Sequence, residues 1–405
     1  MQITDLSTEM KTPPLLRLAF RPLFLFGGLF SAIAMLLWGL ALFGLLNLQP
    51  VGNILFWHSH EMIFGFASAI VVGFLLTAMQ NWTGLRAPHG KTLLVLVLLW
   101  LASRLLLVAG STLPLWLVAT VDLTFLPVAA LLMAKPVLAV RQWRNLFFVP
   151  VLLLLTVCNG LSWAGLYFNN YAWQQHGFYN AVLLITVLMT VVGGRVLPMF
   201  TANGTLTKKV EPILWLDRCA LGALWLVFLQ QFLKLEIYLP QPSIALLYGV
   251  TAVLVAIRCL RWKIWVTGRV PLLWSLHLAY WFIPLGLTLF ALHYSGTALL
   301  GHPVLKSTAM HALTAGAMGS MILAMMARVS LGHTGRPLQV STVMIPAFVL
   351  VITAGICRSI LIVLLPAMSR PLLAIAILCW VLAYTMFCVC YMRILTSDRA
   401  DGRPG

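Results

Sequence analysis

The feature that most constrains this chain is a series of apolar, almost uncharged runs that short polar segments separate. An α-helix of about 20 apolar residues is long enough to cross the hydrocarbon core of a membrane. Because 61% of the 405 residues are hydrophobic and only 9% are charged, a soluble core could not hide the apolar surface. We therefore predict an all-α, polytopic membrane protein with about twelve transmembrane helices. The runs cover residues 22–46, 57–80, 92–110, 112–133, 146–168, 177–199, 212–233, 242–260, 271–294, 304–327, 340–365 and 371–393.

One transmembrane domain is expected over residues 22–395. A cytoplasmic N-terminal segment at residues 1–21 and a cytoplasmic tail at residues 396–405 flank this domain. The first run is too long to be the apolar core of a signal peptide, so we expect it to remain as a span.

The net charge of +17 is unevenly distributed over the connecting segments. Eighteen lysines and arginines fall on alternate connections, Arg258 among them, and three fall on the opposite side. Under the positive-inside rule this distribution places both termini in the cytoplasm and makes the number of spans even. The basic character is therefore interpreted as membrane topology, and no nucleic-acid partner is expected.

Residues 57–62 place two histidines and a glutamate at the start of the second run. Ionisable side chains in hydrocarbon are costly and usually functional. On a helix His58 and His60 point to nearly opposite faces, so we expect them to serve different sites. Glu61 shares a face with His58, which allows this carboxylate to orient that imidazole.

Other ionisable side chains fall inside or near the ends of the runs. Arg104 in the third run and Asp122 in the fourth are expected to form an intramembrane ion pair. Neutral imidazole is a common ligand of haem iron and copper, and arginine suits haem propionates. A single intramembrane histidine also often only bonds to a neighbouring helix, so the residues alone indicate polar sites rather than a defined metal. The candidates among the nine histidines are His58, His60, His176 and His311 toward the outer side, and His277 and His333 toward the inner side, with Arg195 and Arg328. His89, His293 and His302 lie in loops or at span ends and are expected to be solvated.

An internal comparison suggests a repeat of four helices. His60 stands 23 residues before Thr83, and His311 stands 23 residues before Thr334. Asn180 has the same offset from Asn203. The second, sixth and tenth runs are then equivalent helices of three four-helix units.

The seven cysteines favour neither a zinc ribbon nor a disulfide framework, because they lie mostly inside apolar runs and form no C-x-x-C pair. C-x-x-C-H is also missing, so any haem would be held without thioether bonds. We interpret the cysteines as small buried hydrophobic residues.

Several stretches resemble the NnrS family over essentially the whole chain, and the last is the most specific. They are Trp57-His58-Ser59-His60-Glu61-Met62 with Gly65-Phe66, Asn81-Trp82-Thr83-Gly84, Gly193-Gly194-Arg195-Val196-Leu197-Pro198-Met199-Phe200-Thr201, His277 in its Trp-x-x-His context, and His311-Ala312-Leu313-Thr314 through Arg328-x-Ser330-Leu331-Gly332-His333-Thr334-Gly335-Arg336.

The resemblance implies a haem- and copper-containing protein of the bacterial inner membrane that binds or reduces nitric oxide, in denitrification or nitrosative-stress defence. The haem is expected to be a non-covalent haem b. The implied haem or copper ligands are His58, His60, His277 and His311, with His333 for copper, Arg195 and Arg328 beside the haem, and Glu61 as the residue that would admit protons to a reductase. The resemblance does not assign each histidine to haem or to copper, and it does not identify the electron donor.

The span count and the ligand-bearing runs are also similar to the catalytic subunit of haem-copper oxidases, a fold-level analogy that does not fix function. The alternative is a secondary transporter of haem, a metal or another small solute, which the twelve spans and the Arg104–Asp122 pair favour. Transporter repeats usually contain five or six spans with breaks near the midplane, whereas the repeat here contains four. An assembly protein without a cofactor is a third reading.

Overall fold

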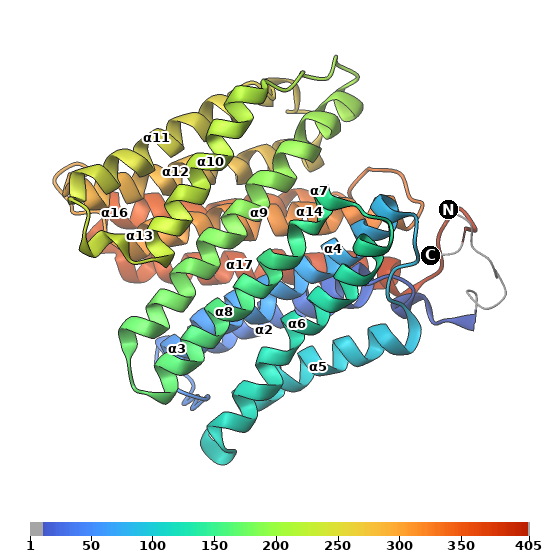
Figure 1. Cartoon of the computed structure of the whole chain (residues 1–405), viewed down its shortest axis with the longest axis horizontal. Coiled ribbons are helices and arrows are strands. Elements are labelled where there is room, and N and C mark those ends of the chain that lie inside the picture. The colour runs from blue at the N-terminus through green and yellow to red at the C-terminus, as the bar shows by residue number, and fades with distance from the viewer. Residues whose placement is uncertain (1–10, 404–405) are drawn as a thin grey trace. The chain divides into compact units, whose positions relative to one another are not determined.

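The computed structural model describes residues 11–403, and its long elements are all helices (Figure 1). Within that part of the chain the β pairing is limited to one isolated bridge between Leu299 and His302. The prediction of an all-α fold is confirmed. The first ten residues of the predicted N-terminal segment and the last two of the predicted tail lie outside the described residues.

The twelve predicted spans all coincide with helices. Eleven spans within residues 11–403 are long and apolar enough to cross a membrane. They contain α2 (Phe20–Leu42), α3 (Ile54–His60), η2 (Glu61–Ala67), α4 (Ser68–Thr83), α5 (Gly90–Val108), α6 (Leu115–Ala139), α7 (Trp143–Leu146), α8 (Phe148–Tyr167), α9 (Tyr171–Thr205), α11 (Gln241–Leu260), α12 (Pro271–Ser295), α13 (Lys306–His311), η6 (Ala312–Met318), α14 (Gly319–His333), α15 (Met344–Ile356), η7 (Cys357–Leu361), α16 (Ile362–Leu364) and α17 (Ser369–Thr396).

The remaining long helix, α10 (Leu214–Phe232), has 19 residues but is more polar, because it carries Asp217 and Arg218 near one end and Gln230 and Gln231 near the other. Short 3₁₀ turns complete the chain. They are η1 (Pro14–Leu16), η3 (Gly110–Thr112), η4 (Leu235–Ile237), η5 (Ile264–Val266) and η8 (Pro366–Met368).

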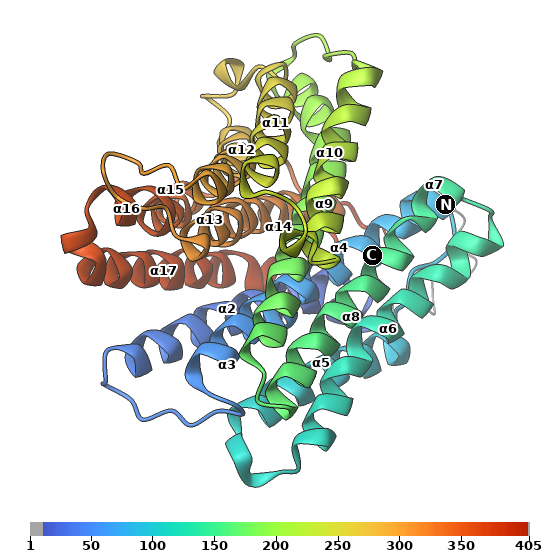
Figure 2. The ribbon, with the colours of Figure 1, turned by 60° about the vertical axis from the view of Figure 1, so that its left-hand side comes forward.

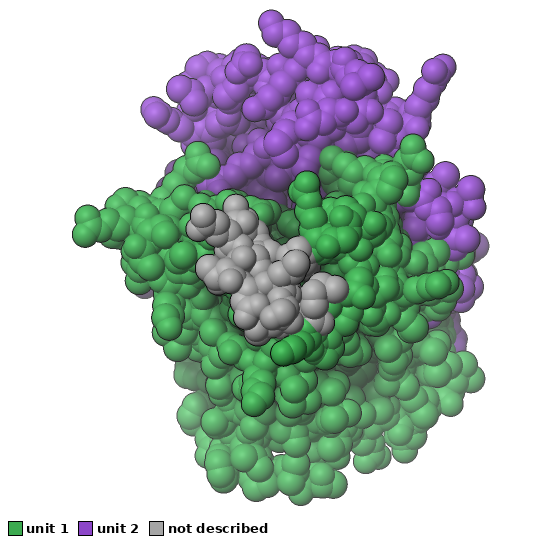
Figure 3. All heavy atoms as spheres, turned by 90° about the vertical axis from the view of Figure 1, so that its right-hand side faces the viewer, with its two compact units in different colours: residues 1–181, 326–339, 384–405 green, residues 182–325, 340–383 purple. Residues whose placement is uncertain are grey.

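The chain divides into two compact units, which Figure 3 colours separately. Unit 1 comprises residues 1–181, 326–339 and 384–405, and unit 2 comprises residues 182–325 and 340–383. Three helices, α9, α14 and α17, contribute residues to both units.

In unit 1, α2 packs on α4, and α6 contacts α4, α5 and α8. Figures 1 and 2 show α5, α6 and α8 running side by side. The outward face of α5 leaves Leu98 and Leu105 more than half exposed, as expected for side chains that face lipid.

The two ends of the described part of the chain lie together in unit 1. The Arg17 guanidinium forms an ion pair with Asp398, and the backbone N–H of Ala400 donates to the carbonyl of Thr334. Two ends on the same side of the spans agree with the predicted even number of crossings.

In unit 2, α11 packs between α10 and α12, and η6 contacts both α12 and α15. The backbones approach closely at Gly316 and Gly355. A Cβ atom on Gly355 would lie only 2.6 Å from the Cα of Gly316. Small residues allow such close helix packing inside membranes.

Two spans contain a π-helix at matching positions. The π-helix η2 begins directly after His60, and η6 begins directly after His311. The same number of residues separates His60 from Thr83 as separates His311 from Thr334, so both wide turns occupy the same register of the proposed repeat. In the most apolar 18-residue stretch of these two spans, 78% and 89% of the residues are buried, which is the highest share among the eleven spans. The sixth span, α9, is α-helical throughout, so it does not share this feature.

Candidate functional site

The most distinctive polar site of unit 1 is a group that we call the buried charge cluster. It combines ionisable side chains from the second, third and fourth spans with polar side chains from the fifth. Its members are His60, Glu61, Arg104, Asp122, Asn159 and Trp163, and each is at most 4% exposed.

Arg104 is the centre of this cluster. Its guanidinium donates to Glu61 Oε2 at 2.7 Å and to Asp122 Oδ1. The predicted ion pair between Arg104 and Asp122 is therefore confirmed. Glu61 is a second carboxylate on the same guanidinium, which the sequence did not predict.

Asp122 receives more hydrogen bonds than any other member. Its Oδ2 accepts from Asn159 Nδ2 at 2.7 Å and from Trp163 Nε1 at 3.0 Å, and His60 Nε2 lies 3.0 Å away. His60 Nδ1 lies 3.3 Å from Glu61 Oε1. Both ring nitrogens of His60 therefore already have polar partners.

The charges of the cluster do not balance through the arginine alone. Two carboxylates face one guanidinium, so one further positive charge is needed, and a protonated His60 would supply it. An uncompensated charge in a low-dielectric interior is costly. The cluster is therefore a place that can hold one proton inside the membrane.

The π-helix η2 positions the cluster. Its carbonyl at Gly65 accepts a hydrogen bond from Trp100 Nε1 at 2.8 Å. A Cβ atom at Gly65 would lie 2.5 Å from Arg104 Nη1 and 2.6 Å from Glu61 Oε2, so only glycine leaves room for the ion pair. Such wide turns often occur at functional sites.

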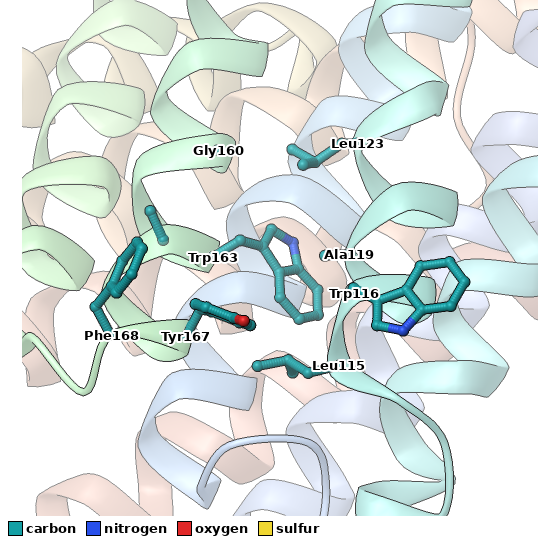
Figure 4. A pocket seen from close by; sticks show the side chains of 9 residues that line it. Leu115, Trp116, Ala119, Leu123, Gly160, Trp163, Tyr167 and Phe168 are labelled. Carbon is teal, nitrogen blue, oxygen red and sulfur yellow. The ribbon is translucent and has the colours of Figure 1, made fainter.

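An apolar pocket of about 220 Å³ adjoins the cluster. Figure 4 shows Trp163 at its centre, with Trp116, Tyr167 and Phe168 around it. The Trp163 indole lines the pocket and its Nε1 donates to Asp122, so this member of the buried charge cluster is shared with the pocket.

Unit 2 contains a buried histidine in a different environment. His277 on α12 is 0% exposed, and its Nε2 lies 2.8 Å from Thr201 Oγ1 on α9, within hydrogen-bond distance. Its Nδ1 has no hydrogen-bond partner within residues 11–403. Thr201 ends the Gly193–Thr201 motif, but the sequence did not single it out.

His311 in unit 2 contacts an arginine instead of a carboxylate. Arg358 Nη2 lies 3.1 Å from His311 Nε2, and His311 Nδ1 lies 2.7 Å from the carbonyl of Ser307. Arg358 lies in the eleventh predicted span, and its contact with His311 was not predicted from the sequence.

The other predicted site residues lie apart from these centres. His58 stacks on Trp38 of α2 with ring centroids 4.1 Å apart, while His60 faces α6 and α8, so the two imidazoles contact different helices. The ring of His333 packs against Phe20. Arg328 is buried in unit 1, and Arg195 is exposed on α9 in unit 2.

The sequence interpretation of Arg258 as a loop charge is wrong. This side chain is 5% exposed on α11 in unit 2. Its guanidinium pairs with Asp217 and donates to the carbonyl of Thr190 and to Tyr280 Oη. Without Arg258, the basic residues on the predicted cytoplasmic connections still greatly outnumber those on the opposite side.

The histidine environments can be compared with the needs of a haem and a copper ion. A metal-ligating histidine typically has one ring nitrogen fixed by a hydrogen bond and the other available. His277 meets this description, and so fits one axial ligand of a haem. His60 and His311 would first have to release polar partners. Within residues 11–403 no three His, Cys, Asp or Glu side chains are grouped as a metal ion would require.

Fold and site together define a multi-pass helical membrane protein. It contains the buried charge cluster and a buried histidine, His277, of which one ring nitrogen is hydrogen-bonded and the other is not. The sequence model described as NnrS protein matches residues 14–399. The match covers nearly the entire chain, and the protein therefore belongs to the NnrS family. None of the curated proteins compared with this chain matches it.

Proposed function

We propose that this protein binds a non-covalent haem through His277 and acts on nitric oxide at the bacterial inner membrane, with both termini in the cytoplasm. The observation that carries the proposal is the His277 imidazole, which is fully buried and has one ring nitrogen without a partner. Membership of the NnrS family supports the link to nitric oxide.

Thr201 has a defined part in this proposal. When His277 Nε2–H donates to Thr201 Oγ1, the lone pair of Nδ1 is left to bind iron. The haem supplies an iron centre that binds small diatomic ligands. Nitric oxide is neutral and lipid-soluble, so it needs no charged path through the spans. Arg195, which belongs to the same unit as His277, remains our proposed partner of a haem propionate. The assignment of Arg328 beside a haem stays a prediction from the family resemblance.

Glu61 is our proposed proton-admitting residue. Its Oε1 and His60 Nδ1 are neighbouring atoms, 3.3 Å apart, that can hold a proton inside the span. Ionisable residues buried in membrane helices are typical of proton relays. Whether nitric oxide is reduced or only bound decides whether these atoms are used in catalysis.

Copper is included because the family resemblance implies it. His58, His60, His311 and His333 are the proposed ligands besides His277. For His60 and His311, binding a copper ion requires that Asp122 or Arg358 move away from a ring nitrogen.

The test is a visible spectrum and a metal analysis of the detergent-purified protein, oxidised and reduced, before and after nitric oxide. We expect a reduced b-type haem band that shifts with nitric oxide. His277→Ala should remove the band. His293→Ala is the matched control, because His293 lies on the same helix with Nδ1 already 2.9 Å from the Val304 carbonyl. A folded, colourless and metal-free protein would contradict the proposal.

A secondary transporter is the second candidate, and the buried charge cluster favours it. Ionisable groups inside spans also mark ion and substrate pathways. The test is uptake into proteoliposomes of haem and of copper, each with and without a pH gradient. Gradient-dependent uptake by a haem-free preparation would support transport over redox chemistry.

A further inference from the structure

Four arginines gather where the two chain ends meet in unit 1. We call them the arginine cluster. They come from three separate parts of the sequence, namely the start of α2, the segment after α14 and the C-terminal tail. The members are Arg17, Arg21, Arg336 and Arg399. The other three arginines all lie close enough to Arg21 for their positive charges to act on its guanidinium.

Arg21 is the most deeply placed member, with 0% of the residue exposed. Its Nη1 donates to the carbonyls of Leu395 and Ser397 at 3.1 and 2.6 Å. Its Nε and Nη2 are buried and have no hydrogen-bond partner among residues 11–403. Buried charged donors without an acceptor are rare in proteins, because each costs its full desolvation penalty.

The two unpartnered donors form a geometric pair. Nε–H and Nη2–H point along the same edge of a guanidinium plane, and together they make the fork that binds two oxygen atoms of an oxyanion. If Arg21 served only to hold the C-terminal tail, Nη1 alone would be sufficient. The fork is therefore available for a separate acceptor.

The surrounding charges also call for an anion. Arg17 pairs with Asp398 at 2.6 Å, and Arg399 pairs with Asp401 at 2.6 Å. Arg336 Nη2 donates to the hydroxyl of Ser397 at 3.2 Å, a neutral partner. Among residues 11–403 the charges of Arg21 and Arg336 therefore have no acidic partner, and this is the excess charge of the cluster.

We propose that the arginine cluster binds a phosphate group on the Nε–Nη2 fork of Arg21. A phosphate group carries one to two negative charges and offers several strong acceptor oxygens, so it matches both the fork and the excess charge. Arg21 stands at the first turn of a candidate span, which is the depth of lipid headgroups. The phosphate group comes either from an anionic phospholipid or from inorganic phosphate. Because Leu395 and Ser397 accept hydrogen bonds from Nη1 of the same buried guanidinium, we expect binding to displace this part of the tail.

The experiment uses the purified full chain in neutral detergent, with thermal unfolding as the readout. One arm compares sodium phosphate with sodium chloride at equal ionic strength. The other adds phosphatidylglycerol or phosphatidylcholine to the micelles. We expect the melting temperature of the wild type to rise with phosphate, with phosphatidylglycerol or with both, and the arm that responds identifies the source.

The variants test the fork and the charge separately. Arg21→Lys keeps the charge but loses the fork, and should weaken binding roughly 10- to 100-fold, as expected for one lost charge-assisted hydrogen bond. Arg336→Gln removes one charge at the half-buried rim of the arginine cluster and should weaken phosphate binding by a smaller factor. If Arg21→Lys does not fold, Arg336→Gln serves as the test of phosphate binding at the cluster. Arg393→Gln removes the same charge from an exposed position of α17 and should bind as the wild type does.

Two results would overturn the proposal. One is a wild type that phosphate and phosphatidylglycerol stabilise no more than chloride and phosphatidylcholine do. The other is an equal loss of binding in Arg393→Gln and Arg336→Gln, which would reduce the effect to general surface charge.

Discussion

Replacing Arg104 by methionine should be the most damaging single change in the buried charge cluster. Methionine fills much of the same volume but leaves the carboxylates of Glu61 and Asp122 without their shared guanidinium. Removing one partner of a buried ion pair typically costs about 3–5 kcal/mol of stability. Neutral side-chain hydrogen bonds in membranes average only about 0.6 kcal/mol each, so the unpaired charge is the decisive part.

Asp122→Asn should change the free energy of unfolding differently in the wild type and in the Arg104→Met variant. In the wild type it leaves Arg104 paired with Glu61 and weakens the bonds from Asn159 and Trp163. Because no charge is left unpaired and charge-assisted bonds are roughly twice as strong as neutral ones, it should cost about 1–2 kcal/mol. In the Arg104→Met background it removes one of two facing carboxylates, and should be neutral or stabilising.

Equilibrium unfolding in detergent micelles titrated with sodium dodecyl sulfate, followed by circular dichroism, measures these free energies. Thr120→Val on the exposed face of α6 is the control and should stay within about 0.5 kcal/mol of the wild type. The reasoning is refuted if Asp122→Asn costs the same in both backgrounds to within about 0.5 kcal/mol, since that is the additivity of independent sites.

Three further changes can be measured in the same assay. Gly65→Ala should cost about 1–3 kcal/mol, because the added Cβ would press on Arg104. Gly222→Ala should instead stabilise α10 by about 0.5–1 kcal/mol, because its Cβ meets open space. Equal effects of the two substitutions would contradict this reasoning. Asn53→Ala should cost about 1 kcal/mol, since the Asn53 side chain caps α3 by accepting two backbone N–H bonds, and Asn53→Ser should recover most of the loss. Trp163→Phe keeps the ring that lines the pocket and loses one bond to the buried charge cluster, so a loss of about 1 kcal/mol is expected, and no loss would mean that the bond is dispensable.

The spans and the all-α fold were predictable because the length of an apolar run sets the element in a membrane. The Arg104–Asp122 pair was predictable for a related reason, since opposite charges in neighbouring spans seldom stay apart. The short loop between the third and fourth spans brings both into reach.

The wider cluster was not predictable from helical periodicity. Three-residue spacing placed Glu61 on the face of His58, yet Glu61 contacts His60 and Arg104. The π-helix begins at Glu61, and a regular 3.6-residue period does not continue through it. The contact of Arg358 with His311 was missed for a similar reason, because Arg358 lies in the π-helix η7.

The partners of His277 were also beyond the sequence. Thr201 stands 76 residues earlier, and although it ends the stretch 193–201, nothing in the sequence pairs it with His277. Arg258 was misplaced because a basic residue near the end of an apolar run usually marks a loop, whereas here Asp217 from the neighbouring helix neutralises it.

The matching π-helices have a consequence for the ancestry of the chain. π-Helices are rare, and they are frequent at functional sites. Two of them in one register are explained most simply by one π-helix that preceded a duplication. The two copies now differ in charge, because Glu61 follows the first histidine and Ala312 follows the second. The first histidine has an acid beside it, and the second contacts an arginine.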